Sequence, residues 1–211
     1  MLKAGRSLLT AGFAWLLLAS PVGAQETAPD VLVKNVTLEV IDLISKDKDI
    51  QSGNQGKLIE LVEAKALPHF NFGAMTRLAV ATNWEKATAE QKKQLTDEFR
   101  TLLVRTYSSA LSVYRDQKFE FRPLRAKPTD TDVTVQVRIN SQGGREPVTL
   151  EYDMEKTAAG WKVYDVRVAG VSLVANYRTE FANEIRSSGI DGLIKGLVAK
   201  NRGPAQRAER K

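Results

Sequence analysis

The side chains able to support metal, acid–base or nucleophilic chemistry are scarce in this sequence. It contains one histidine, His69, and no cysteine. A catalytic zinc ion usually takes three protein ligands, so a lone imidazole without a second histidine or a thiolate does not predict a metal site. We therefore expect no metal and no cofactor, and we interpret His69 as an ordinary loop residue.

Three other motifs partly resemble catalytic or phosphate-binding sites but lack features that such sites need. The segment Gly170-Val171-Ser172-Leu173 lacks the second glycine of a nucleophile elbow, so its serine is better explained as a helix cap. Gly143-Gly144 is too short for a phosphate-binding loop. We interpret Asp165, Arg167 and Arg178 as a structural ion-pair group. The sequence thus predicts no catalytic residue and no enzyme.

The first 24 residues have the composition of a secretory signal peptide. Lys3 and Arg6 precede an uncharged run from Ser7 to Ala19, and Val22-Gly23-Ala24 follows with small residues where a signal peptidase reads. The run is shorter than the ~20 apolar residues of a membrane-spanning helix, which disfavours a membrane anchor as the alternative. We expect residues 1–24 to be removed on export.

Composition and charge limit what the exported chain does. Taking 24 residues from 211 leaves 187, enough for one domain with a sizeable core. Lys3 and Arg6 leave with the signal peptide, so 29 basic residues face 25 acidic ones, a net charge of +4. Charges of both signs are mixed along the chain, which argues against nucleic-acid binding. The one basic cluster, residues 202–211, predicts a flexible tail, with contact to an acidic partner or a lipid surface as the alternative.

Steps of three and four residues separate the apolar residues of the first half of the chain and of its end, as in amphipathic helices. A capping box at Thr88-Ala89-Glu90-Gln91 opens the longest helix, which we expect to extend to Arg115 for ~42 Å. Asn71 caps a shorter helix, and Pro68 ends the one before it. The β-branched run from Val36 to Ile41 leaves a strand as the alternative for the first helix. The expected helices are Pro29 to Ser45, Leu58 to Leu67, Asn71 to Leu78, Thr88 to Arg115, Ser172 to Ile185 and Ile190 to Val198.

Between these helices the apolar period changes to two, as in an antiparallel sheet with one wet face. Hairpin turns are expected at Gln142 to Arg145 and at Thr157 to Gly160. The expected strands are Phe119 to Arg122, Val133 to Ile139, Val148 to Met154 and Trp161 to Val168. The sequence therefore predicts an α+β fold: a curved antiparallel sheet of about four strands cupped over helices, with additional N- and C-terminal helices.

The segment from Trp161 to Phe181 also resembles a known family. Its pattern, W-x-V-Y-D-V-x-V-x-G-V-S-L-V-x-N-Y-R-x-x-F, is similar to the hallmark of the MlaC family, also called the toluene-tolerance family. The chain departs from the family pattern at His69 and Asn71, where Tyr and Asp are more frequent, and it lacks a Leu-Gly pair around Ala81. The similarity continues through Leu67 to Phe72, Met75, Trp84, Ala87-Thr88, Gln91, Tyr107, Leu111, Tyr114 and Gly189 to Leu193.

This resemblance implies a function that periodicity does not show. The family consists of soluble periplasmic proteins of Gram-negative bacteria that hold a phospholipid by its acyl chains and maintain outer-membrane lipid asymmetry. It implies a nuclear-transport-factor-like sheet with a deep apolar cavity, in a single domain spanning residues 25–201. It implies as partners an inner-membrane Mla ABC transporter with an MCE-domain subunit and an outer-membrane lipoprotein complex. We expect a monomer that carries phospholipid as cargo, without nucleic acid and without stable membrane insertion.

The inward-facing apolar residues are the candidate lipid-binding site. The alternative function is an exported hydrolase or isomerase on a cone-shaped α+β scaffold, which the missing acid–base and nucleophile pairs disfavour. The candidate lipid-binding residues are Phe70, Phe72, Met75, Leu103, Tyr107, Leu111, Tyr114, Val133, Val135, Val137, Val148, Leu150, Tyr152, Val163, Val166, Val171, Val174, Tyr177 and Phe181.

Overall fold

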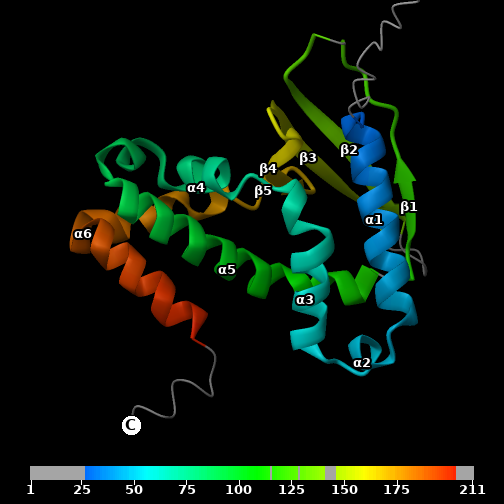
Figure 1. Cartoon of the computed structure of the whole chain (residues 1–211), viewed down its shortest axis with the longest axis horizontal. Helices are drawn as coiled ribbons and strands as arrows, with labels where there is room; N and C mark the ends of the chain where they lie inside the picture. The colour runs from blue at the N-terminus through cyan, green and yellow to red at the C-terminus, as the bar shows by residue number, and fades with distance from the viewer. Residues whose placement is uncertain (1–26, 115, 128, 141–145, 203–211) are drawn as a thin grey trace, which may run out of the picture.

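A long central helix connects a sheet at one end of the molecule with a group of helices at the other (Figure 1). The computed structural model describes residues 27–114, 116–127, 129–140 and 146–202, and the side chains of 113 and 114 are not described. The expected signal peptide, the turn at 142–145 and the tail beyond Arg202 lie outside these residues. No helix in the described ranges is long and apolar enough to cross a membrane.

Three helices precede the central one on the sheet side: α1 (Pro29–Lys46), α2 (Lys48–Gln51) and α3 (Gln55–Lys65). Helix α1 continues through the run from Val36 to Ile41, so the helical interpretation is confirmed over the strand. Asp47 and Asn54 cap α2 and α3 by accepting backbone N–H groups of the first turn. The short α2 was not among the expected helices, because four residues are too few to show a period.

The chain then forms η1 (Leu67–His69), α4 (Phe72–Val80), η2 (Ala81–Lys86) and the central helix α5 (Ala89–Tyr114). Both predicted caps are confirmed. Asn71 Oδ1 accepts the N–H of Ala74 at 3.1 Å. Thr88 Oγ1 accepts the N–H of Gln91 at 3.1 Å, and Gln91 Oε1 accepts the N–H of Thr88 at 3.0 Å, which completes the capping box.

The sheet contains five antiparallel strands in the order β1-β2-β3-β4-β5, one more than expected. Alternating apolar residues on β2 to β4 face the helices, and alternating polar residues form the opposite face. The strands are β1 (Lys118–Phe121), β2 (Asp132–Asn140), β3 (Val148–Thr157), β4 (Gly160–Val168) and β5 (Val171–Ser172).

A β-bulge keeps one face of β4 apolar although the spacing of its valines changes. Val163 pairs with Met154, and Asp165 pairs with Asp153, so Tyr164 is an extra residue on β4. The extra residue places Val163 and Val166 on the same face, which a strict period of two forbids. Without the bulge, the second half of β4 would turn its polar residues toward the helices.

The prediction of a helix from Ser172 to Ile185 is wrong in its first turns. Ala169 and Gly170 have φ values of +49° and +81°, which form a two-residue hairpin turn and send the chain back as β5. Ser172 pairs with Arg167 in the sheet, so the chain stays extended there. The helical segments that follow are η3 (Ala175–Tyr177) and α6 (Arg178–Asn201), and α6 breaks at a non-helical glycine, residue 189.

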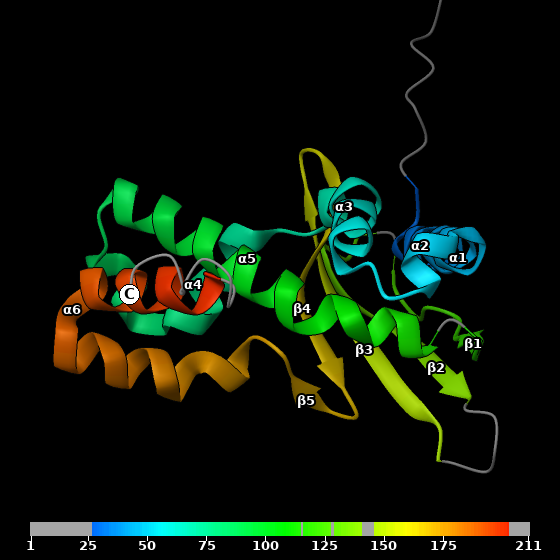
Figure 2. The same cartoon turned by 90° about the horizontal axis from the view of Figure 1, so that it is seen from below.

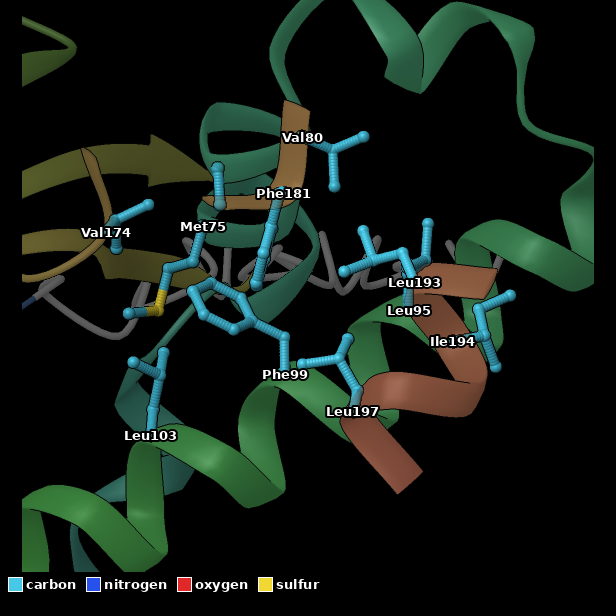
Figure 3. Packing of buried hydrophobic residues seen from close by; sticks show 11 residues of the cluster. Met75, Val80, Leu95, Phe99, Leu103, Val174, Phe181, Leu193, Ile194 and Leu197 are labelled. Atoms are coloured by element: carbon cyan, nitrogen blue, oxygen red, sulfur yellow. The ribbon is translucent and has the colours of Figure 1, made fainter. Parts of the chain in front are cut away.

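Three clusters of buried residues hold these elements together. The first fills the helical end, where the rings of Phe99 and Phe181 meet edge to face with centroids 5.2 Å apart (Figure 3). The second lies between the sheet and the start of α1, around Val135 and Met154. The third joins α1, α2 and α3 around Ile44. Helix α5 runs from beside α4 and α6 toward the sheet, where α3 lies beside it (Figure 2).

Candidate functional site

A cavity of about 470 Å³ lies where the three clusters come together. Its wall includes members of each cluster, such as Leu103 of the first, Met154 of the second and Val40 of the third. The volume is within the range of ~300–1,000 Å³ that ligand pockets occupy. The wall is almost entirely apolar, so the space suits an apolar ligand better than water, which needs polar partners.

Much of the predicted site lines this cavity. The central helix contributes one side, the η1–α4 segment closes one end, and β3 and β4 provide part of the opposite wall. The predicted residues found in the wall are Phe70, Phe72, Met75, Leu103, Tyr107, Leu111, Leu150, Tyr152, Val163 and Val166.

The three central valines of β2 lie outside the cavity wall. Val133, Val135 and Val137 are buried in the second cluster, where partly buried Leu32 and Leu124 also pack. This packing fills the space over that part of the strand, and from β2 only Ile139 reaches the wall. Val148, half-buried at the start of β3, also lies outside the wall, and the side chain of Tyr114 is outside the described residues.

The predicted residues that follow the β4–β5 turn belong to the helical end instead. Val171 is 59% exposed on the edge strand β5. Val174 and Phe181 are buried in the first cluster, and Tyr177 packs there against Phe99, with ring centroids 5.1 Å apart. The β4–β5 turn explains why these residues lie at the helical end, because it directs the chain away from the sheet and toward the start of α5.

Helix α1 supplies the largest part of the wall that the sequence interpretation missed. The available signal is the helical step of Val33, Val36 and Val40, which indicates an inward face but not whether that face packs or lines a space. The unpredicted wall residues are Leu32, Val33, Val36, Thr37, Val40 and Ile41 of α1, and Val62, Ala66, Leu67, His69, Val104, Ser108, Ala110, Phe119, Ile139, Met154, Val168 and Leu173 elsewhere.

The tyrosines of the wall keep their protons at neutral pH. Burial raises the pKa of Tyr152 to about 12, although a side-chain hydrogen bond with Thr37 acts in the opposite direction. Burial also raises the pKa of Tyr107 to about 12, with the neighbouring Tyr177 adding to the effect. Both hydroxyls have partners, so the interior of the cavity is uncharged and its polar groups are satisfied.

His69 lies in the cavity wall rather than in an ordinary loop. The segment that follows it is fixed to the sheet, because the N–H of Asn71 donates to the carbonyl of Val163 at 2.8 Å. Burial lowers the pKa of His69 below its usual 6.5, and Lys162 lowers it further, while Glu39 acts in the opposite direction. The imidazole is therefore mostly neutral at pH 7.

The serine considered as a nucleophile has a structural role. Ser172 Oγ donates to Asp165 Oδ2 at 2.5 Å and accepts the N–H of Ala175 at 2.8 Å. Asp165 is 8% exposed and also accepts the N–H of Val166 at 2.8 Å. These bonds fix the corner between β4 and η3, so Ser172 holds the chain in place between the sheet and the 3₁₀ helix.

Among the described residues, neither of the two arginines considered with Asp165 forms an ion pair with it, although its charge acts on Arg167 at longer range. Arg167 Nη2 lies 2.8 Å from Asp153 Oδ1 on the polar face of the sheet. Arg178 Nε donates to the carbonyl of Leu78 at 2.8 Å, which ties α6 to α4. Among the described side chains, no three of the His, Cys, Asp and Glu type are arranged to hold a metal ion.

A larger depression, of about 870 Å³, lies at the connection between β1 and β2. Its wall is mostly polar, with charges of both signs such as Arg125 and Asp130. A mixed-charge wall offers little apolar area for burial, so the smaller, apolar cavity is the better candidate site.

Comparison with known proteins agrees with this fold. The family model described as "MlaC protein" matches residues 34–199. The chain is 24% identical over 179 residues to the intermembrane phospholipid transport system binding protein MlaC of Haemophilus influenzae, covering 84% of each chain. It is 26% identical over 215 residues to the toluene tolerance protein ttg2D of Pseudomonas putida, covering 97% of this chain and 98% of that protein.

A solved structure resembles the chain over most of its length. It is the phospholipid-binding protein from Ralstonia solanacearum, determined in complex with a phospholipid. The two sequences are 38% identical, and the match covers 83% of this chain and 97% of the other, with a TM-score of 0.76. By the extent of the family match and by this structural similarity, the chain belongs to the MlaC family.

Proposed function

We propose that this protein is a periplasmic phospholipid carrier, which holds acyl chains in the apolar cavity and moves lipid between the inner and outer membranes. The observation that carries the proposal is the cavity itself: about 470 Å³ of apolar space lined by α1, α5, the η1–α4 segment and the sheet. The 38% identical Ralstonia protein, which holds a phospholipid, supports the same function.

Transfer energetics explain why a carrier is needed. Moving one CH₂ group from an apolar environment to water costs about 0.8 kcal/mol, so exposing two acyl chains of ~16 carbons costs more than ~20 kcal/mol. An apolar cavity removes most of that cost by replacing the membrane interior. Affinity that comes from burying acyl chains depends on their length and only weakly on the headgroup.

Apart from the imidazole of His69, the described wall is chemically inert, which suits transport rather than turnover. Tyr107 and Tyr152 are protonated, and Ser172 is engaged in a structural corner. We infer that the protein is not an enzyme, needs no cofactor and leaves its lipid unchanged. Bound phospholipid incubated with the purified protein is expected to remain intact for hours, without release of fatty acid or lysolipid.

Lipid transport also requires a location and partners. We infer that export removes residues 1–24, that residues 25–201 fold as the lipid-binding domain in the periplasm, and that 202–211 form a basic tail. Lipid is exchanged with an inner-membrane ABC transporter through its MCE-domain subunit and with an outer-membrane lipoprotein complex. A monomer suffices, because one chain supplies all the described residues that line the cavity.

The experiment that tests this function is mass spectrometry of a solvent extract of the protein purified from the periplasm. The expected result is phospholipid in stoichiometric amount relative to protein, retained through size-exclusion chromatography. Protein that is fully folded and carries no phospholipid, and takes up none from vesicles of phosphatidylethanolamine and phosphatidylglycerol, contradicts the proposal.

A further inference from the structure

The cavity ends toward the helical end of the molecule where its wall meets the first cluster. Among the described residues, the side chains that both line the cavity and pack in that cluster are Phe70, Phe72, Met75, Leu103 and Tyr107. Met75 and Leu103 are 4% and 5% exposed, so the wall is closed to solvent at these two residues. Phe99, which is fully buried in the same cluster, does not line the cavity. Packed side chains therefore fill the space beyond this part of the wall.

Met75 has a fixed position in this wall. It lies in the first turn of α4, and its N–H donates to the carbonyl of the cap residue Asn71 at 3.0 Å. Asn71 is bound to the sheet, because its N–H donates to the carbonyl of Val163 at 2.8 Å and its Nδ2 to Glu155 Oε1 at 2.6 Å. Figure 3 shows the Met75 side chain extending from α4 toward Leu103 of α5. Since the backbone is held in place, a change in the size of this side chain changes the space in front of it.

The volume of the cavity limits the apolar chain that it accommodates. A dry apolar cavity of ~150 Å³ binds benzene, which has six carbon atoms. In the same proportion, the cavity of about 470 Å³ accommodates ~19 carbon atoms, roughly one acyl chain of 16 to 18 carbons. Carbon atoms beyond that number stay in water, and each CH₂ group left in water weakens binding about four-fold relative to a membrane.

We propose that Met75 determines the longest acyl chain that the cavity accommodates, and so the selectivity of the protein for chain length. An acyl chain that reaches this end of the cavity meets the Met75 side chain, and the filled cluster behind it allows no further entry. This inference rests on the proposed carrier function, because it takes an acyl chain as the occupant of the cavity.

Two substitutions at this position have opposite expected effects. Met75→Ala removes three side-chain atoms, which adds room for about three carbon atoms. Met75→Phe adds three atoms, and the ring takes up space in the cavity because the cluster behind it is already filled. Leu95→Ala is the matched control, since Leu95 is fully buried in the same cluster and does not line the cavity.

The test measures how uptake from vesicles depends on acyl-chain length. Phosphatidylcholine vesicles, each containing one lysophosphatidylglycerol with a saturated chain of ~12 to ~24 carbons, bracket the expected capacity. They are incubated with the purified, delipidated protein, which is then separated and analysed by native mass spectrometry. Uptake by the parent is expected to be similar up to ~18 carbons and to fall about four-fold for each further CH₂ group, because those groups leave the membrane for water. The fall is expected to begin about three carbons later in Met75→Ala, about three carbons earlier in Met75→Phe, and at the parent's length in Leu95→Ala.

Each other outcome overturns a specific statement. No uptake of any chain length by the folded parent overturns the carrier function. Uptake of ~24-carbon chains as readily as ~16-carbon chains by the parent shows no length limit, which overturns this inference and leaves the carrier function intact. The inference is also overturned if folded Met75→Ala and Met75→Phe share the parent's limit, or if Leu95→Ala shifts that limit as far as Met75→Ala does. If Met75→Ala has no cooperative thermal transition, the limit measured for Met75→Phe decides.

Discussion

At the residue scale, burial determines which substitutions the sheet tolerates. Val135 is 2% exposed within an apolar cluster, whereas its neighbour Gln136 is exposed opposite Glu151. Val135→Glu places a carboxylate among apolar side chains, which costs several kcal/mol or forces the group to take up a proton. We expect this variant to lose its cooperative thermal transition, measured by circular dichroism. Gln136→Lys is expected to change the free energy of unfolding by less than ~0.5 kcal/mol. If Val135→Glu melts like the parent, Val135 does not lie in the core.

His69 makes the stability of the lipid-free protein depend on pH. Its pKa is lowered in the folded state relative to 6.5, so the folded state binds fewer protons near that pH than the unfolded state does. The contribution of His69 to the free energy of unfolding is therefore present above pH 6.5 and is lost as pH falls through the folded-state pKa. Urea unfolding at several pH values is expected to show this loss in the parent and not in His69→Gln. Parallel pH profiles for the two proteins would exclude the effect.

At the element scale, the junction between α4 and η2 contains backbone strain. Ala81 has φ +54° and ψ −133°, a conformation that favours glycine. Such strain costs ~1–3 kcal/mol, so Ala81→Gly is expected to increase the free energy of unfolding by about 1 kcal/mol. Ala182→Gly, on an exposed turn of α6, is the matched control and is expected to reduce it by about 1 kcal/mol. Urea unfolding measures both changes, and a loss of stability in Ala81→Gly would contradict the strain.

The sequence predicts elements well where a period or a cap specifies them. The capping box at Thr88 and the cap at Asn71 both form, and the alternation in Val133 to Ile139 forms a strand. The bulge at Tyr164 and the strand β5 were not predicted. They depend on which strand lies alongside, and a local pattern contains no information on that pairing. Serine is a residue type that often caps helices, but the hairpin turn before Ser172 places this residue in strand β5.

At the scale of the whole molecule, the cavity is a property of how three clusters meet. The periodicity of the sequence identifies the inward-facing residues of each cluster. It identified the candidates Tyr107 and Tyr152, which line the cavity. Periodicity does not distinguish an inward-facing residue that packs, such as Val137, from one that lines a space, such as Leu150. That difference depends on the distance between elements far apart in sequence. The resemblance to the MlaC family implied a cavity, and the structure identifies the residues that line it.

The measurement that tests the central claim most directly is the ratio of phospholipid to protein in two matched variants of α1. Val36 lines the cavity, whereas Val31, five residues earlier on the same helix, is 44% exposed. Val36→Trp places an indole in the cavity at a cost of ~1–3 kcal/mol from overpacking, which leaves the domain folded. We predict that folded Val36→Trp retains less than about a tenth of the parent's bound phospholipid, a loss of at least ~1.4 kcal/mol of binding. Val31→Trp is predicted to retain all of it, because that side chain is exposed. Equal lipid content in the two folded variants would contradict the assignment of this cavity as the lipid site.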